Sequence, residues 1–329
     1  MLALNKGDIR EVVSMRDAIE LVKLAFRELT EGRAQVPLRS MIDVTPGRDA
    51  MLLMPAYLPG MSSLGFKVIS IFQENGKRGL PVGNALVCAV DPETGVPAAL
   101  MSGAYLTALR TGAVSGASTE LMARKDAKNL VVIGSGTQGV TQAAAVCEVR
   151  DIERITVVYR SESSFERYRK MVEQDWPHLT GRLVGSSDAE SAVRDADVVC
   201  LATTSRTPVF DASWARPGTH VSGVGSFTPE MQEAPAEYIA NARVVVDMKE
   251  HALEEAGDLI IPLRDGTISE DHIVGELGEL VQGSIAGRTS DDELTYFKSV
   301  GNAVQDMAVA SAVVTRAREK GLGQEIDLE

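Results

Sequence analysis

The segment at residues 130–139, LVVIGSGTQG, constrains the fold of this chain more than any other part of the sequence. A short apolar run typical of a buried strand ends in glycines, and a helix of small residues is expected at 137–149. Gly134 permits a tight turn, Gly136 lets the main chain approach a pyrophosphate, and Gly139 allows close packing of helix on sheet. The pattern predicts a dinucleotide-binding Rossmann unit, with a purely structural turn as the alternative.

The backbone amides at the start of this helix would donate hydrogen bonds to the phosphates of the dinucleotide, and the positive end of the helix dipole would attract their negative charge. We therefore expect the loop to contact a nicotinamide cofactor. The residues expected to do so are Gly134, Ser135, Gly136, Thr137 and Gln138.

The apolar run that follows the glycine loop, at 154–160, indicates which dinucleotide binds. A carboxylate about 20 residues after the loop would hydrogen-bond the ribose 2′-hydroxyl of NAD. The run ends instead in Arg160 and Ser161, which suit the 2′-phosphate of NADP. We expect NADP(H), with both residues in contact with it. The nearby Glu162 leaves NAD(H) open, and a solvated arginine at a strand end is the structural alternative.

Other apolar runs alternate with helical segments after residue 129, at 195–204, 219–225 and 242–248. This alternation predicts an α/β fold with a doubly wound parallel sheet. The run at 195–204 ends in Thr203 and Thr204 and is followed by Ser205, and the hydroxyls of these three residues would lie near the cofactor. A polar loop without a ligand explains these three residues nearly as well. We expect the last segment, 294–321, to form a long amphipathic helix outside the strand series.

The first third of the chain has a different pattern. Apolar spacing at 15–31 predicts an amphipathic helix, with Ser14 as its N-cap and Gly32 as its stop. Short apolar runs at 51–58, 64–72, 85–91 and 96–101 predict strands, the last two joined by a turn at 91–95. A helix of small residues is expected at 103–123.

Three cations in this first third stand among apolar or small neighbours, and they are Arg39, Lys67 and Arg110. A buried cation must be paired or functional, so a structural ion pair is the alternative for each of them. Two arginines suit a clamp on a carboxylate. A desolvated lysine acquires a lowered pKa and can serve as an acid or a base.

The overall composition excludes several classes of protein. A net charge of −13 argues against nucleic acid as a partner, and no apolar run is long enough to span a membrane. The first residues do not resemble a signal peptide, so a cytoplasmic protein is expected. Three dispersed cysteines indicate buried thiols, and four histidines without ligand spacing predict no metal.

The ordered motifs of the whole chain resemble the ornithine cyclodeaminase/mu-crystallin family. They are PLR at 37–39, MPAY at 54–57, GFK at 65–67, LRTGA at 109–113, GSGTQG at 134–139, EEAGDLIIPL at 254–263 and FKSVG…QD near the end. The resemblance implies a substrate and dimerisation lobe of α+β type, built from 1–118 with 301–329, beside a Rossmann domain at 119–300. It also implies a homodimer.

The same resemblance assigns roles to individual residues. Arg39 and Arg110 would bind the substrate carboxylate, and Met54 would line the same substrate site. Lys67 would transfer a proton at the reacting Cα–N unit, while hydride passes between the nicotinamide and Cα. Thr111 would contact the cofactor.

One position departs from the family's namesake reaction. Cyclodeaminases carry an Asp where this chain has Phe227, so no carboxylate is available there to handle the substrate amine, and nothing in the sequence places Glu230 or Glu233 as its replacement. We therefore expect an NAD(P)H-dependent oxidoreductase acting on the C–N bond of a small α-imino or α-amino acid, such as pyrroline- or piperideine-2-carboxylate. The alternatives are an ornithine cyclodeaminase and a non-catalytic NADP-dependent binding protein of mu-crystallin type.

Overall fold

The computed structural model describes residues 1–327, and the chain forms two compact units. One unit comprises Met1–Arg110 with the chain from Asn302 onward, and the other comprises Thr111–Gly301. The first boundary between the two units lies between Arg110 and Thr111, within helix α3 (Gly103–Met122). This position precedes the domain boundary expected at 118/119. The domain assignment at 118/119 and 300/301 stays a prediction.

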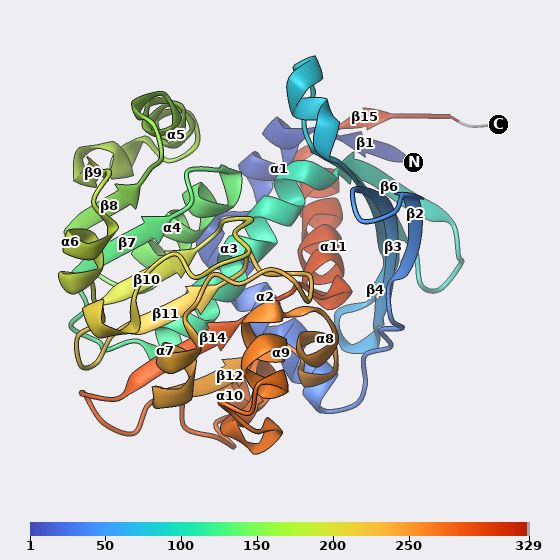
Figure 1. Cartoon of the computed structure of the whole chain (residues 1–329). Coiled ribbons are helices and arrows are strands. Elements are labelled where there is room, and N and C mark those ends of the chain that lie inside the picture. Colours follow the sequence, from blue (N-terminus) through green and yellow to red (C-terminus); the bar gives the residue numbers. More distant parts are fainter. Residues whose placement is uncertain (328–329) are drawn as a thin grey trace. The chain divides into compact units, whose positions relative to one another are not determined.

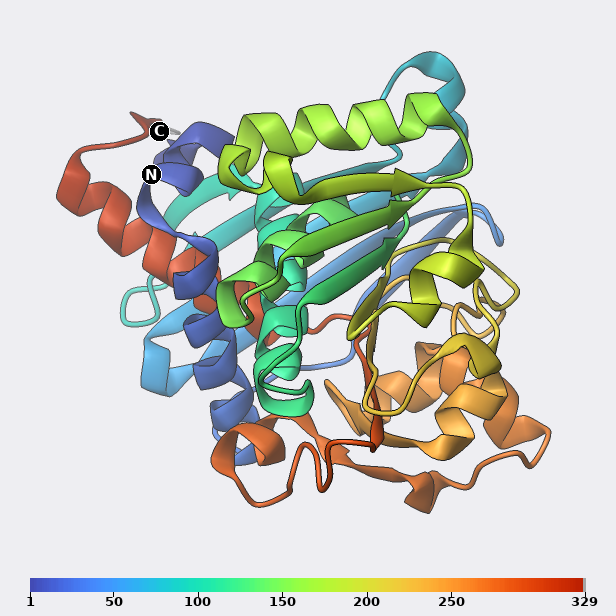
Figure 2. The same ribbon diagram turned by 90° about the vertical axis from the view of Figure 1, so that its left-hand side faces the viewer.

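The second unit is built on a sheet of eight parallel strands in the order β13-β12-β14-β11-β10-β7-β8-β9. The predicted α/β class with a doubly wound parallel sheet is thereby confirmed. Figure 2 shows these strands running side by side, with α5 along the β8–β9 side. The strands are β7 (Asn129–Ile133), β8 (Arg154–Val158), β9 (Leu183–Ser186), β10 (Val198–Leu201), β11 (His220–Gly223), β12 (Ala242–Val246), β13 (Ile273–Glu276) and β14 (Leu294–Lys298).

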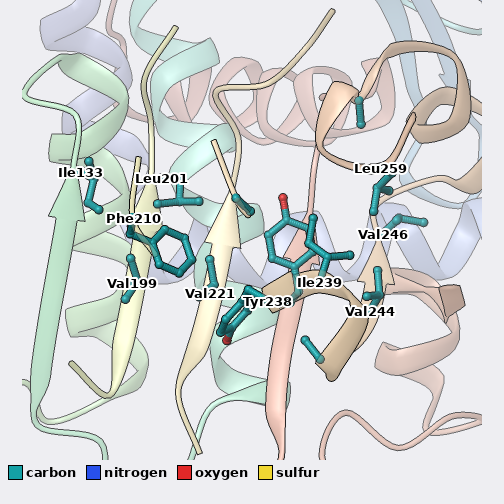
Figure 3. Packing of buried hydrophobic residues seen from close by; sticks show 14 of the residues in the cluster. Ile133, Val199, Leu201, Phe210, Val221, Tyr238, Ile239, Val244, Val246 and Leu259 are labelled. Carbon is teal, nitrogen blue, oxygen red and sulfur yellow. The ribbon is translucent and has the colours of Figure 1, made fainter. Parts of the chain in front are cut away.

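Helices connect these strands and cover the sheet. They are α4 (Thr137–Val149), α5 (Glu162–Asp175), α6 (Ala189–Arg194), α7 (Ala236–Asn241), α8 (Lys249–Glu255), α9 (Gly257–Arg264) and α10 (Leu277–Gln282). The sheet core combines valine and isoleucine side chains with alanines, leucines and aromatic rings, and Figure 3 shows Val199 and Val221 among them. In the same cluster, the rings of Phe210 and Tyr238 meet edge to face with centroids 5.6 Å apart.

The expectation of an unbroken helix at 294–321 was wrong. Its first residues form β14, which is hydrogen-bonded between β11 and β12 inside the sheet. Thr295, Tyr296 and Phe297 are fully buried, so the run has no polar face and no alternation. Periodicity cannot separate such a buried strand from a helix. The helix that follows, α11, spans Ala303–Lys320.

The first unit contains a mostly antiparallel sheet in the order β15-β1-β6-β5-β4-β3-β2. Its other helices are α1 (Lys6–Val12) and α2 (Met15–Thr30), and α2 begins at Ser14 as its N-cap, as predicted. Figure 1 shows α11 lying along β3 and β4, and α2 also packs on α11. The strands are β1 (Leu2–Leu4), β2 (Ser40–Thr45), β3 (Asp49–Leu58), β4 (Ser63–Phe72), β5 (Gly83–Val90), β6 (Pro97–Ser102) and β15 (Gln324–Glu325).

Candidate active site

Lys67 lies on β4, on the face of the first sheet that is covered by α11. Its neighbours across the adjoining strands are Met54 on β3 and Val87 on β5. All three are almost completely buried, with Lys67 only 1% exposed. The lysine that stands inside an apolar run of the sequence is therefore a desolvated amine in the structure.

The partner of Lys67 is Asp306 on α11, the Asp of the FKSVG…QD motif, to which the sequence alone assigned no role. The Lys67 Nζ lies 2.8 Å from Asp306 Oδ2, and the Arg110 Nε lies 3.0 Å from Oδ1 of the same carboxylate. Arg110 also donates 2.6 Å to Oε1 of the adjacent Gln305. The structure thus brings Lys67 and Arg110 together on one buried carboxylate, and α11 supplies both anchors.

The protonation of Lys67 is set by opposing influences. Burial is the largest, followed by the positive charge of Arg110, and together with Arg39 these lower the pKa of Lys67 to about 7. Asp306 acts in the opposite sense and favours the ammonium form. Lys67 is therefore poised between its two protonation states near neutral pH, as a proton-transfer group requires.

Arg39 and Met54 also lie in the surroundings of Lys67. Arg39 precedes β2 and is half-buried, and its charge acts on Lys67. Met54 is 4% exposed beside Lys67 in the β3–β4 register. The four residues that we expected to bind or convert the substrate are thus neighbours within one unit.

In the second unit, the glycine loop has the geometry that its spacing predicts. Gly134 adopts a φ of 125°, and a Cβ there would overlap the carbonyl oxygen of Ala202. A Cβ on Gly139 would overlap the carbonyl oxygen of Gly134. Both glycines are therefore required by close approaches of main chain to main chain.

Gly136 differs from these two because a Cβ there would meet nothing within 4 Å. It is the N-cap of α4, and no side chain caps the start of that helix. Gly136 and Thr137 are exposed, with Ser135 and Gln138 partly exposed beside them. Open space over uncapped helix amides fits the pyrophosphate of a dinucleotide.

Arg160 and Ser161 follow the end of β8, next to the glycine-loop strand β7. Both are exposed, and among the described residues Arg160 has no recorded hydrogen bond or ion pair. The Ser161 and Ser163 hydroxyls are 3.1 Å apart. The adjacent Glu162 lies against the Tyr159 hydroxyl and, as the largest influence, raises its pKa.

The loop after β10 abuts the glycine loop through Ala202, which places Thr203, Thr204 and Ser205 at the carboxyl ends of β7 and β10. In this fold, ligands bind at this edge, where the strand order reverses. The Thr203 amide and hydroxyl donate to Glu233 Oε1 at 2.6 and 2.8 Å. Thr203 is thus held by a buried carboxylate that no pattern in the sequence assigns to this position.

Glu233 also accepts hydrogen bonds from the amides of Gly225 and Ser226, at 2.6 and 3.0 Å. It is fully buried, and burial with the neighbouring Asp258 carboxylate raises its pKa to about 7. Both of its oxygens brace loops at the ends of β10 and β11, so Glu233 is a structural link. Phe227 is half-buried and Glu230 is exposed.

Thr111 belongs to the second unit and is 8% exposed, next to Gly112. A Cβ on Gly112 would overlap the carbonyl oxygen of Thr141, so α3 and α4 touch there.

Within residues 1–327, no three His, Cys, Asp or Glu side chains are grouped to hold a metal ion. No helix in the same range is long and apolar enough to cross a membrane.

Comparison with known proteins gives relatives that cover the whole chain. The Δ1-pyrroline-2-carboxylate reductase of Bacillus cereus is 40% identical over 328 residues, 99% of this chain and 100% of that protein. The solved structure of the Thermococcus litoralis Δ1-pyrroline-2-carboxylate reductase, in complex with NADH and L-proline, has a TM-score of 0.94 at 40% identity, covering 99% and 100%. An archaeal alanine dehydrogenase dimer with bound NAD has a TM-score of 0.90 at 33% identity, covering 100% and 99%.

The family assignment follows from these matches. Residues 2–321 match the profile of the ornithine cyclodeaminase/mu-crystallin family. Because this match and the solved relatives extend over nearly the full length, the resemblance inferred from the motifs is confirmed, and the chain belongs to the ornithine cyclodeaminase/mu-crystallin family.

Proposed function

We propose that this protein is an NAD(P)H-dependent oxidoreductase that reduces the C=N bond of a small cyclic imino acid, such as Δ1-pyrroline-2-carboxylate. The observation that carries the proposal is the buried group of Lys67, Arg110 and Asp306. One carboxylate faces two cations, so with Lys67 protonated the group has a surplus positive charge. A buried charge needs a counter-ion, and a substrate carboxylate provides one. Reductases of this substrate are among the relatives of the chain.

The chain's own residues suit the steps of such a reduction. Arg110 and Arg39 hold the carboxylate, which fixes the orientation of the imine. The Lys67 ammonium donates a proton to the imine nitrogen, and its pKa of about 7 makes this transfer easy at neutral pH. A bound reduced nicotinamide supplies the hydride that the imine carbon accepts.

The test is a pair of assays on the purified protein. Pyrroline-2-carboxylate is incubated with NADPH or NADH while the nicotinamide absorbance is followed, and ornithine is incubated with NAD while ammonia is measured. We expect loss of the reduced cofactor in the first assay, abolished in Lys67→Ala with cofactor binding retained. Ammonia release without net change of cofactor would instead identify a cyclodeaminase. If neither the nicotinamide absorbance nor the ammonia concentration changes, the result would favour a non-catalytic binding protein.

We also propose that NADP(H) is preferred over NAD(H). The support is Arg160, an exposed cation without a recorded partner among the described residues, beside the Ser161 and Ser163 hydroxyls. These donors match a 2′-phosphate. Arg160→Asp should move the ratio of kcat/KM for NADPH over NADH at least tenfold toward NADH. An unchanged ratio would remove Arg160 from cofactor selection.

A homodimer is the third part of the proposal, and the outer face of the first sheet supports it. Leu53, Val68 and Leu86 form a row across β3, β4 and β5 on the face opposite Lys67. Leu53 is 38% exposed and Leu86 is 43% exposed, although both are apolar. A second copy of the chain would cover such a face. Leu53→Lys should give monomers in sedimentation velocity, whereas Val96→Lys, at an exposed position directly before β6, should not.

A further inference from the structure

Two consecutive residues of α11, Gln305 and Asp306, hold Arg110 at two of its nitrogen atoms. Asp306 accepts from Nε at 3.0 Å, and Gln305 Oε1 accepts from a terminal nitrogen at 2.6 Å. Both α11 side chains are fully buried. The second terminal nitrogen of Arg110 has no recorded hydrogen bond among the described residues.

Chemistry fixes the orientation of the Gln305 amide. A guanidinium only donates hydrogen bonds, so the amide oxygen must face Arg110 and the amide nitrogen must point elsewhere. That nitrogen is buried and has no hydrogen-bond partner within the described part of the chain. The two anchors therefore leave unused donors, one on Arg110 and one on Gln305, and a substrate carboxylate has the acceptor oxygens that such donors require.

Asp306 has a second role through its other oxygen, which accepts from Lys67 at 2.8 Å. The charged groups that act on Lys67 come from three elements: Asp306 on α11, Arg110 on α3 and Arg39 before β2. The neighbours of Lys67 on β3 and β5 are Met54 and Val87, which carry no charge. Asp306 is the one acidic group among these influences, and without it Lys67 would face only cations in a desolvated setting.

We infer that Asp306 is the positioning residue of the reduction: its carboxylate keeps Lys67 in the ammonium form as proton donor and, with Gln305, orients Arg110 for the substrate carboxylate. This inference rests on the proposed function. Reduction adds hydride to the carbon and a proton to the nitrogen of the imine. The proton comes from Lys67, which regains one from water.

The experiment compares three variants with the wild type. Asp306→Asn keeps the shape and one acceptor oxygen but removes the charge, and Asp306→Glu restores the charge on a longer stem. Ser63→Ala is the matched control, because the Ser63 hydroxyl donates 2.7 Å to the carbonyl of Met307 on the same helix turn but touches neither cation. Each variant is measured for kcat and KM against pH with pyrroline-2-carboxylate, and for thermal unfolding.

We expect Asp306→Asn to move the alkaline limb of kcat/KM to lower pH by about one unit or more, since an opposite charge at this distance shifts a pKa by about 1–3 units. Its KM for the imino acid should rise about tenfold or more, because the single amide oxygen can accept from Lys67 or from Arg110 but not from both, and the amide NH₂ then faces the other cation. Asp306→Glu should return the alkaline limb of kcat/KM at least part of the way to its wild-type pH. Ser63→Ala should change neither the position of this limb nor the KM. An unmoved limb and KM in a folded Asp306→Asn protein would overturn the inference.

A second measurement separates this inference from the proposed function. In protein labelled with ¹⁵N-lysine, the Nζ signal of Lys67, assigned by its absence in Lys67→Ala, reports protonation without turnover. The signal should titrate at lower pH in Asp306→Asn than in the wild type, whichever substrate the enzyme uses. Equal titration in both proteins would refute the role of Asp306, whereas a shifted titration without imine reduction would refute only the substrate.

Discussion

Alanine substitutions in the glycine loop should affect cofactor binding at one position and protein stability at another. Gly136 has a φ of −94°, and a Cβ there would meet no atom within 4 Å, so Gly136→Ala introduces no clash. Alanine is a poorer N-cap than glycine, which costs about 1 kcal/mol of folding free energy. The added methyl occupies the space over the uncapped start of α4, where a phosphate oxygen would accept hydrogen bonds. Losing one charge-assisted hydrogen bond costs about 1.5–3 kcal/mol, or about 10–150-fold in Kd.

Gly139→Ala should instead lower the stability of the protein. Its Cβ would overlap the Gly134 carbonyl oxygen, so α4 must move away from the loop, and such overpacking costs about 1–3 kcal/mol or more of stability. Urea unfolding measures the stability of both variants, and quenching of protein fluorescence by NADPH measures cofactor affinity. Native affinity in Gly136→Ala, or native stability in Gly139→Ala, would refute this account of the loop.

Three further outcomes follow from buried groups and from the exposed sheet face. Because the pKa of Lys67 is about 7 and its ammonium form donates the proton, kcat/KM for imine reduction should fall as pH rises through about 7; a rate that climbs there would contradict this role. Glu233→Gln turns an amide NH₂ toward backbone amides that donate to the wild-type carboxylate, so urea unfolding should show a loss of about 1–3 kcal/mol in the free energy of unfolding. Double replacement of Leu53 and Leu86 by Lys should raise the concentration at which dimers form by more than tenfold, as sedimentation equilibrium would show.

Local patterns predicted much of the fold. The helix expected at 137–149 has those bounds as α4, because the glycines before it and its small residues are local signals. Strand β14 was missed because it is a buried inner strand, so its sequence shows no alternation of apolar and polar residues. Its pairing with β11 and β12 also joins residues far apart in the sequence. The strand β2 also lay outside the prediction, since its side chains are largely exposed.

The site was predicted unevenly for a similar reason. A cation in an apolar strand drew attention to Lys67, and the same argument applied to Asp306, a carboxylate in the small-residue helix AVQDMAVA, would have found its partner. No comparable signal exists for Glu233. Its function depends on the amides of Thr203 and Gly225, which meet only when two parallel strands end side by side.

The place of β14 also bears on how this protein is made. Ribosomes release the chain from its N-terminus, yet the strand between β11 and β12 comes from Leu294–Lys298, and α11, which covers the first sheet, follows it. Until those last residues emerge, β11 and β12 lack the strand that joins them and present unpaired edges. Neither unit can therefore close during most of synthesis. Chains that stop before residue 294 should be aggregation-prone substrates of chaperones rather than folded fragments.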